Sequence, residues 1–518
     1  MPAGPARVSL LRYSPALILF SIVIADARQH SDPDLWGHVL WGRELLANGS
    51  LPHNNPYSYS APGFPWLRHE WLSEVVMAAM FDTFGPFGLK LLKFACTACT
   101  IFFVASAESE TGAPVTWQAA ILLVVALILA PVMQFRPQLF DFLSLSAIIA
   151  LLARHNWRGS APLWIAVPIV AIWSNFHGGF FIGLLAMGSY GAATIVSDIF
   201  AGRGPRRGLG IIAITAAAAA STLCTFLIPP ARDTWYTLIH EITNPMTHTT
   251  MADWKPLLAA LTTADSGSVE QKYFVLVLLF FTAAVLAVIL QPGGADAPMV
   301  AVAAVMLATA FTAVRNVPIA AIAIAPVITN HISRLAAGRT MTTSPADAGQ
   351  SHRAPRLAME VLVAVVAIGF ARYNGILKRG IDASDSPADA VDFMNSHRLA
   401  GNVLADYAWG QYVIWHGAPG TKVFIDSRYD LGYPPAVIRD YVALDNGTAG
   451  GSHTLAAYPH DFVLLKKDSP AATLMESQPA WRLIYSDQVA MLYARKGADA
   501  ASIPAIPVLG TSHRWQFP

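Results

Sequence analysis

The sequence has few charged residues. Only 13% of its 518 residues are charged and 54% are hydrophobic, whereas about a quarter of the residues in a soluble globular domain are charged. This balance excludes an ordinary soluble protein and predicts an integral membrane protein. We expect such a chain to have the lipid bilayer as a partner and no nucleic acid.

Cysteine is also scarce, with three residues in the whole chain. All three lie in apolar segments, so no disulfide framework is expected. The Cys96-x-x-Cys99 pair lacks the two further ligands that a tetrahedral metal site needs. We interpret the pair as small residues at a contact between helices. A repeat of fixed period and an internal symmetry between two halves are absent as well, which argues against a transporter.

Eleven apolar stretches are long enough, or nearly so, to cross a hydrocarbon core of about 30 Å. They lie at 9–27, 88–107, 113–133, 138–153, 162–176, 178–198, 208–228, 272–291, 297–314, 317–334 and 357–372. The prediction is therefore a mostly α-helical polytopic membrane protein with about 11 transmembrane helices.

The arginines predict the orientation of these spans, because short cytoplasmic loops carry excess Lys and Arg. With eleven spans, the basic groups fall on one side, which is then the cytoplasm. They are Arg7 and Arg12, Arg154 and Arg158, Arg203, Arg206 and Arg207, and Arg334, Arg339, Arg353 and Arg356. Most clusters of polar residues, and everything after residue 372, then lie outside. The C-terminal part is therefore expected to be extracytoplasmic.

Two segments leave alternatives open. The stretch 71–84 is apolar but short and carries Glu74 and Asp82. We interpret it as a short helix on the outer side that does not cross the membrane. It could also be a span if one additional span restores the orientation of the later ones. The first span could instead be a cleaved secretory signal, since Ala25-Asp26-Ala27 resembles a cleavage site.

The chain divides into a transmembrane domain and a soluble tail. We expect the transmembrane domain over 1–375, with a first outer loop at 28–87 that contains amphipathic helices, a second outer loop at 229–271 and an inner linker at 336–356. A soluble α/β domain is expected over 380–518. Its helix should start near Ser386, and its strands should lie at 402–407, 411–415, 422–426, 462–467, 481–485 and 489–494, the last two forming a hairpin.

The first outer loop carries the acids that favour chemistry most. In Ser31-Asp32-Pro33-Asp34-Leu35-Trp36, an Asp followed by Pro is typical of a helix start, so Asp32 could simply cap a helix. Asp34 could serve the helix dipole, but a carboxylate at this place can also act as a general base or hold a divalent cation. His69 and Glu70 end the loop and could join Asp34, or begin a hydrated helix. As neighbours in sequence they are not expected to face each other on a helix.

Polar residues also stand at the ends of several spans, where charge is costly and usually functional. They are Arg136, Asn175, His177, Arg315 and Asn316. Arginine suits a phosphate because its planar fork donates paired hydrogen bonds, although each arginine could also extend to the headgroups. In the tail, Asp406, Asp426 and Arg428 follow strands, and we interpret them as structural.

These motifs resemble the GT-C superfamily of bacterial glycosyltransferases, and the resemblance covers almost the full length. It rests on Asp32-Pro33-Asp34-Leu35-Trp36-Gly37-His38, Gly49-x-x-Pro52, Tyr57-Ser58, Ala61-Pro62-Gly63, His69-Glu70-Trp71-Leu72, Arg136-Pro137-Gln138-Leu139-Phe140, Asn175-Phe176-His177-Gly178-Gly179-Phe180, Arg315-Asn316-Val317-Pro318, Asp406-Tyr407-x-Trp409-Gly410 and Val423-Phe424-Ile425-Asp426-x-Arg428. These motifs are those of one subgroup of the superfamily. The chain departs from the pattern of that subgroup at Gly37, where a second Trp is usual, and at Ile228-Pro229-Pro230, where Asn-Pro is usual.

The resemblance implies an inverting transfer of a sugar from a polyprenyl phosphate or diphosphate donor to a glycan, lipid or protein acceptor. It makes Asp34, with Asp32, His69 and Glu70, the candidate catalytic set. Arg136, Asn175, His177, Arg315 and Asn316 become the candidate substrate-binding residues. A divalent cation, Mg²⁺, Mn²⁺ or Ca²⁺, could be held by Asp34; no other cofactor is expected.

The Asp-Pro-Asp sequence also resembles the acidic first-loop motif of oligosaccharyltransferase catalytic subunits, whose acid contacts a metal. This chain lacks the large soluble domain with a WWDYG-like motif that those enzymes carry. Two other function classes stay open: a non-catalytic factor in the assembly of envelope polysaccharide, and, less favoured, a transporter.

Overall fold

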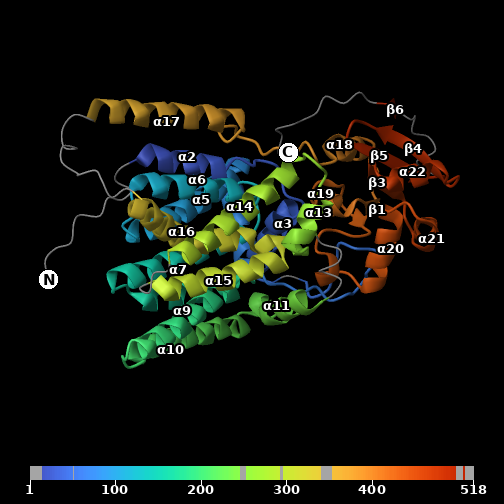
Figure 1. Ribbon diagram of the computed structural model, residues 1–518. Helices are drawn as coiled ribbons and strands as arrows, with labels where there is room; N and C mark the ends of the chain where they lie inside the picture. The colour runs from blue at the N-terminus through green and yellow to red at the C-terminus, as the bar shows by residue number, and fades with distance from the viewer. Residues whose placement is uncertain are drawn as a thin grey trace. The chain divides into compact units, whose positions relative to one another are not determined.

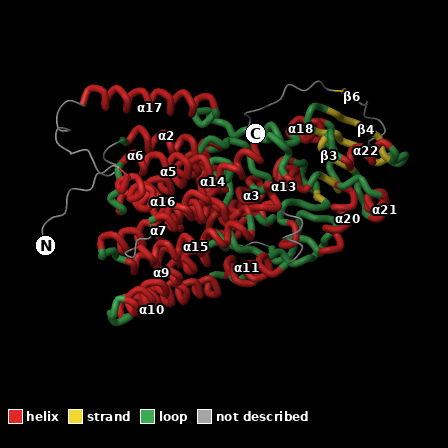
Figure 2. Tube along the Cα trace, in the orientation of Figure 1, coloured by secondary structure: helices red, strands yellow, loops and turns green. Residues whose placement is uncertain are grey.

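The computed structural model describes residues 14–50, 52–244, 252–291, 296–339, 353–497 and 506–507. Arg7, Arg12 and most of the expected inner linker lie outside these ranges. The described chain is mainly helical with one small sheet near its C-terminus (Figures 1 and 2). Its contacts divide it into two compact units.

The first unit, called here the helical unit, comprises Met1–Gln29, Leu91–Ile228 and Leu238–Leu377. Helices follow the expected apolar stretches closely. They are α2 (Pro15–Ala25), α5 (Pro86–Glu110, mostly in this unit), α6 (Val115–Leu129), α7 (Gln138–Arg158), α8 (Ala166–Phe176), α9 (Phe180–Phe200), α10 (Arg206–Ser221), α14 (Val269–Leu290), α15 (Ala297–Thr312), α16 (Val317–Arg339) and α17 (Arg353–Tyr373). Within the unit, α9 packs against α10 and α15, α16 against α15 and α6, and α17 against α2 (Figure 1).

Among the described residues, six helices are long and apolar enough to cross a membrane. These are Pro86–Glu110, Gln138–Arg158, Phe180–Phe200, Arg206–Leu227, Val269–Leu290 and Val314–Ala337. Such a set is what a polytopic membrane protein requires. The shorter apolar helices, α2, α6 and α15 among them, leave the total of eleven crossings a prediction.

The second unit, called here the mixed unit, comprises His30–Lys90, Pro229–Thr237 and Lys378–Pro518. The first outer loop and the tail therefore belong to the same compact unit. Its helices are α3 (Leu35–Asn48) and α4 (Trp71–Phe84) from the loop, and α18 (Ala388–Ser396), α19 (Gly410–His416), α20 (Pro435–Asp445), α21 (Ala449–Ala457) and α22 (Pro470–Glu476) from the tail. At 14 residues, α4 is a short helix, as expected, and it packs on α3.

The sheet of the mixed unit has the strand order β2-β1-β3-β5-β4-β6. Its strands are β1 (Asn402–Ala405), β2 (Lys422–Val423), β3 (Phe462–Lys466), β4 (Trp481–Ser486), β5 (Ala490–Arg495) and β6 (Ile506–Pro507). β1 pairs in parallel with β2 and β3, whereas β5 runs antiparallel to β3 and β4. The expected mixed α/β tail and its last hairpin, β4 with β5, are thus both present.

One predicted strand is wrong: residues 411–415 belong to helix α19. Tyr412 and His416, one helical turn apart, both contact the indole of Trp36, with ring centres 5.0 and 4.6 Å away. A strand would place these two side chains far apart along the chain, so packing around Trp36 overrides the strand preference of the aromatic and β-branched residues.

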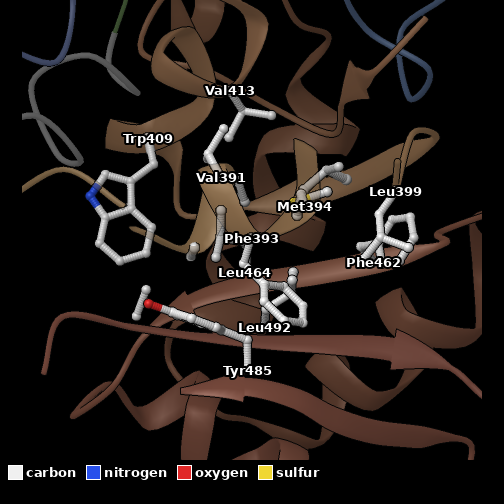
Figure 3. Close-up of a cluster of buried hydrophobic side chains, with 14 of the residues drawn as sticks. Val391, Phe393, Met394, Leu399, Trp409, Val413, Phe462, Leu464, Tyr485 and Leu492 are labelled. Carbon is white, nitrogen blue, oxygen red and sulfur yellow. The ribbon is translucent and has the colours of Figure 1, made fainter. Parts of the chain in front are cut away.

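The core of the mixed unit lies between α18, α19 and the sheet. Figure 3 shows Val391, Phe393 and Met394 of α18 close to Leu464 and Leu492 of the strands. Trp36 of the first loop belongs to the same buried cluster. Backbone bonds add to this connection, because Val423 N–H donates to Tyr57 O at 2.9 Å and Leu67 N–H donates to Leu431 O at 3.1 Å. The first loop is therefore held on the tail by both packing and hydrogen bonds.

Candidate active site

The acids of the first loop stand at the start of α3. Asp32 is 3% exposed, and its Oδ1 accepts a hydrogen bond from the backbone N–H of Asp34 at 3.0 Å. Asp32 thus shapes the turn that opens the helix, as its sequence context indicated. Asp34 occupies the N-cap position, but its side chain makes no capping hydrogen bond to the helix. Its half-buried carboxylate is therefore directed to other partners.

One such partner is Gln411 of α19. Its Nε2 donates to Asp34 Oδ1 at 3.1 Å, and its Oε1 accepts from the backbone N–H of Gly37 at 2.9 Å. The Gln411 side chain is buried, with the residue only 1% exposed. A hydrogen bond thus joins Asp34 of the first loop to a residue of the tail.

Next to Asp34, three side chains converge: His38 of α3, Glu74 of α4, and Glu70, the residue before α4. His38 Nδ1 lies 3.6 Å from Glu74 Oε1 and 3.9 Å from Glu70 Oε2. Asp34 and Glu70 are the N-cap residues of α3 and α4, and His38 and Glu74 follow them by four residues, one helical turn into each helix. His38 and Glu74 are buried, and His38 Nδ1 has no hydrogen-bond partner.

Burial and charge act in opposite directions on His38. Burial alone lowers the pKa of its imidazole, but contact with Glu74 and the negative charges of Glu70 and Asp34 raise that pKa to about 9. Burial in turn raises the pKa of the Glu74 carboxyl. Without a metal, the cluster therefore favours a proton on His38 at neutral pH.

His69 and Glu70 contact each other, contrary to the expectation. His69 Nε2 lies 3.5 Å from Glu70 Oε1. The expectation assumed that both residues are helical, but α4 begins only at Trp71. In the non-helical segment before it, neighbouring side chains can turn toward the same side.

Among the described residues, His38, Glu70 and Glu74 offer ligand atoms within 4.8 Å of one another. Imidazole and carboxylate together suit Mn²⁺ and related divalent cations. The buried Nδ1 of His38, which faces both carboxylates, is the atom that a cation would use. These residues therefore fit a metal ion better than the single carboxylate of Asp34.

In the helical unit, His177 pairs with an acid that the sequence analysis did not single out. Its Nδ1 lies 2.6 Å from Asp141 Oδ2, while Trp173 Nε1 donates to Asp141 Oδ1 at 2.6 Å. All three side chains are buried. A Cβ on Gly179 would lie 2.4 Å from Asp141 Oδ1, so only glycine fits beside this group. Asn175 is buried nearby in sequence and donates to Ala171 O at 2.9 Å.

The two candidate phosphate-binding arginines both contact the second outer loop. Arg136 Nη1 lies 3.6 Å from Asp253 Oδ2. The guanidinium of Arg315 lies over the ring of Trp254, 4.6 Å from its centre. Both arginines therefore meet adjacent residues of one short 3₁₀ turn. Asn316 donates to Thr309 O at 3.1 Å and so supports the turn that carries Arg315.

The interpretation of the tail acids as structural agrees with their contacts. Arg428 Nη2 lies 2.6 Å from Asp426 Oδ2 in a buried ion pair. Asp406 accepts from Ala408 N–H at 3.0 Å and pairs with Lys466 at 3.0 Å.

Sequence reasoning missed His38, Glu74, Asp141 and Gln411 as candidate site residues. The spacing of four residues from Asp34 to His38 and from Glu70 to Glu74 was a signal that could have found the first two. Asp141, in the first turn of α7, is an acid at a span end. Gln411 had no such signal, because only the packing of the tail on the first loop brings it to Asp34.

Solved structures of low sequence identity share this architecture. The Archaeoglobus fulgidus oligosaccharyltransferase, with an acceptor peptide containing the NVT sequon tethered by a disulfide, matches over 93% of this chain and 74% of its own at 10% identity and a TM-score of 0.52. The chain has the GT-C glycosyltransferase fold. A second GT-C structure, the arabinofuranosyltransferase AftD from Mycobacteria, matches 96% of this chain and 42% of its own at 12% identity and a TM-score of 0.53. No protein-family model matches the chain, and no curated protein matches its sequence.

Proposed function

We propose that this protein is a membrane glycosyltransferase. It transfers a sugar from a polyprenyl phosphate or diphosphate carrier to a glycan, lipid or protein acceptor of the cell envelope, on the outer face of the bacterial inner membrane. The observation that carries the proposal is the carboxylate of Asp34 at the start of α3, which does not cap its helix and is held by Gln411. The GT-C fold supports the reaction class.

In the proposed reaction, an acceptor hydroxyl attacks the anomeric carbon of the sugar. The new bond from the acceptor oxygen to this carbon forms as the bond from the carbon to the phosphate oxygen breaks, so the configuration inverts. The hydroxyl proton passes to Asp34, which acts as general base. The electron pair of the broken bond leaves with the carrier phosphate.

Arg136 and Arg315 are the proposed ligands of that phosphate. Charge grows on the leaving phosphate during the reaction, and preorganised cationic groups lower the barrier most where water is scarce. In the structure, Arg136 contacts the carboxylate of Asp253. Arginine binds carboxylate and phosphate oxygens with the same charged hydrogen bonds, so the same guanidinium can bind a phosphate. The guanidinium plane of Arg315 is oriented by Trp254.

Loss of either arginine should weaken binding of the donor. A hydrogen bond to a charged group contributes about 1.5–3 kcal/mol, so we expect Arg136→Met and Arg315→Met each to raise KM for the donor about 10- to 100-fold. Arg154→Met is the matched control, because Arg154 is an exposed arginine near the other end of α7. Equal KM values in all three variants would argue against the phosphate role.

A divalent cation fits the proposed site at His38, Glu70 and Glu74. When bound, it would supply positive charge beside Asp34. The ligand set predicts that Mn²⁺ raises the unfolding temperature of the purified protein and that Glu74→Gln removes this shift, because ligands bind and stabilise the folded state. Glu44→Gln, which changes an acid of α3 outside the cluster, should keep the shift. A full Mn²⁺ shift in Glu74→Gln would exclude this site.

The reaction itself can be tested with the lipid extract of a strain that lacks the gene. If the proposal is right, that extract contains the accumulated sugar donor, and the purified protein consumes it in the presence of envelope material from the same strain. Mass spectrometry should show the free carrier phosphate and a glycosylated product. Unchanged extract, together with sugar uptake that depends on the protein, would favour a transporter instead.

A further inference from the structure

We propose that Gln411 is a positioning residue for Asp34, so that the C-terminal part of the chain completes the active site. This inference rests on the proposed function, in which Asp34 is the general base. It assigns to the tail a direct part in the transfer, through helix α19.

The orientation of the Gln411 amide follows from its two partners. A backbone N–H can only donate, so the Gly37 N–H, 2.9 Å away, requires the amide oxygen on its side. The amide nitrogen must then face Asp34 Oδ1, 3.1 Å away, where it donates to the carboxylate. This hydrogen bond fixes the rotation of the carboxylate, and a general base must be held in a defined orientation toward the hydroxyl that it deprotonates.

Gly37 gives this arrangement the space it needs. A Cβ at this position would lie 2.1 Å from Gln411 Oε1, well inside contact distance. Any side chain there would push Gln411 away from Asp34. In the subgroup that the chain resembles, a second Trp is usual at this position. A Trp side chain would occupy the space of the Gln411 amide, so Gln411 can bind Asp34 here because residue 37 is a glycine.

Helix α19 is itself firmly seated on the first loop. Trp36, 2% exposed, contacts Tyr412 and His416 of α19. Trp415 of the same helix contacts Phe81 of α4, with ring centres 5.9 Å apart. Gln411 is therefore carried by a packed helix rather than by a loop, as accurate positioning of a catalytic group requires.

A purely structural role for Gln411 makes a different prediction. A buried hydrogen bond would stabilise the contact between loop and tail, and its loss would lower stability without changing the turnover of the protein that remains folded. Turnover per folded molecule therefore separates the two roles. Trp409→Phe provides a matched control, because it removes a hydrogen bond from a side chain to a backbone carbonyl, from Trp409 Nε1 to Asp385 O at 2.8 Å, and leaves Gln411 and Asp34 unchanged.

The experiment measures kcat and relative KM with the lipid extract of the gene-deletion strain as donor, at several dilutions. We expect Gln411→Met and the isosteric Gln411→Glu to lower kcat about 10- to 100-fold with little change in KM. Gly37→Ala should lower kcat similarly, and the double variant Gly37→Ala/Gln411→Met should be no slower than the slower single variant, because both remove the same contact. Trp409→Phe should keep kcat within about twofold.

The outcomes separate this inference from the function on which it rests. A wild-type kcat in folded Gln411→Met or Gln411→Glu, with Asp34→Asn inactive, would overturn the role of Gln411 and leave the proposed function standing. Multiplying effects in the double variant would also contradict a shared contact. Full transfer by Asp34→Asn would instead remove the catalytic role of Asp34, and the role of Gln411 with it.

Discussion

Replacement of Asp34 by asparagine is expected to lower the rate of sugar transfer by about 10²- to 10⁴-fold, the usual contribution of a general base. Asparagine has nearly the size of aspartate and keeps a carbonyl oxygen that can accept the hydrogen bond from Gln411. It cannot take a proton from an acceptor hydroxyl. The variant should therefore fold normally and bind the donor, but fail in the chemical step.

The neighbouring acid provides the control for this prediction. Asp32 accepts a hydrogen bond from the Asp34 N–H through Oδ1, and asparagine can do the same through its amide oxygen. We therefore expect Asp32→Asn to retain transfer within about tenfold. Rates are compared at equal amounts of folded protein, judged by size-exclusion chromatography. If Asp32→Asn were inactive and Asp34→Asn active, the catalytic acid would be Asp32 and the role assigned to Asp34 would be wrong.

Removal of Arg428 should produce the largest loss of stability in the mixed unit. Its guanidinium donates to Asp426 through Nε at 2.9 Å and through Nη2 at 2.6 Å, and to Asn55 Oδ1 at 2.9 Å. Asp426 is fully buried. Because Arg428→Met would leave this carboxylate buried without its counter-charge, we expect the free energy of unfolding to fall by about 3–5 kcal/mol.

Aromatic rings surround the same arginine. The guanidinium carbon lies 4.5 Å from the ring centre of Trp66, 5.0 Å from that of Trp41 and 5.4 Å from that of Tyr57. These three residues belong to the first loop, whereas Arg428 and Asp426 belong to the tail. The ion pair and its rings therefore hold the two segments together.

A double variant tests the electrostatic reason. Asp426→Asn/Arg428→Met removes both charges, so no uncompensated buried charge remains, and the loss should be smaller than in Arg428→Met alone. Thermal unfolding in detergent, followed by tryptophan fluorescence, measures both. If the double variant is as unstable as the sum of the two single variants, the buried charge is not the cause.

The sequence alone predicted the helical part of the fold well. Long apolar runs such as 272–291 and 178–198 can form little else in a membrane, where every backbone group must be bonded within its own segment. The predicted strands at 402–407 and 462–467 were also found, because short apolar runs between turns are typical of buried strands. Packing around Trp36 turned 411–415 into a helix instead, and local preference carries no information on such a distant contact.

For the candidate site, the sequence indicated several candidate residues but not the side chains that contact them. Asp34, Glu70 and His69 were singled out because they stand in the first outer loop, where a carboxylate can act as a general base or hold a divalent cation. The partners that organise them were not. Gln411 lies 377 residues from Asp34 in sequence, and an uncharged glutamine in an apolar run has no feature that marks it. Arg428 could be assigned to an ion pair with Asp426, since only one residue separates them, but its aromatic surroundings depend on the folded first loop.

If the protein transfers a sugar from a lipid-linked donor with Asp34 as its general base, one measurement in cells should show it most directly. Polyprenyl-linked sugars and envelope glycans are compared by mass spectrometry in a gene-deletion strain complemented with wild type or with Asp34→Asn at equal protein level. We expect the wild type to restore the missing sugar, and Asp34→Asn to leave it missing while the lipid-linked donor accumulates. Full restoration by Asp34→Asn would contradict the account and favour a non-catalytic role in envelope assembly.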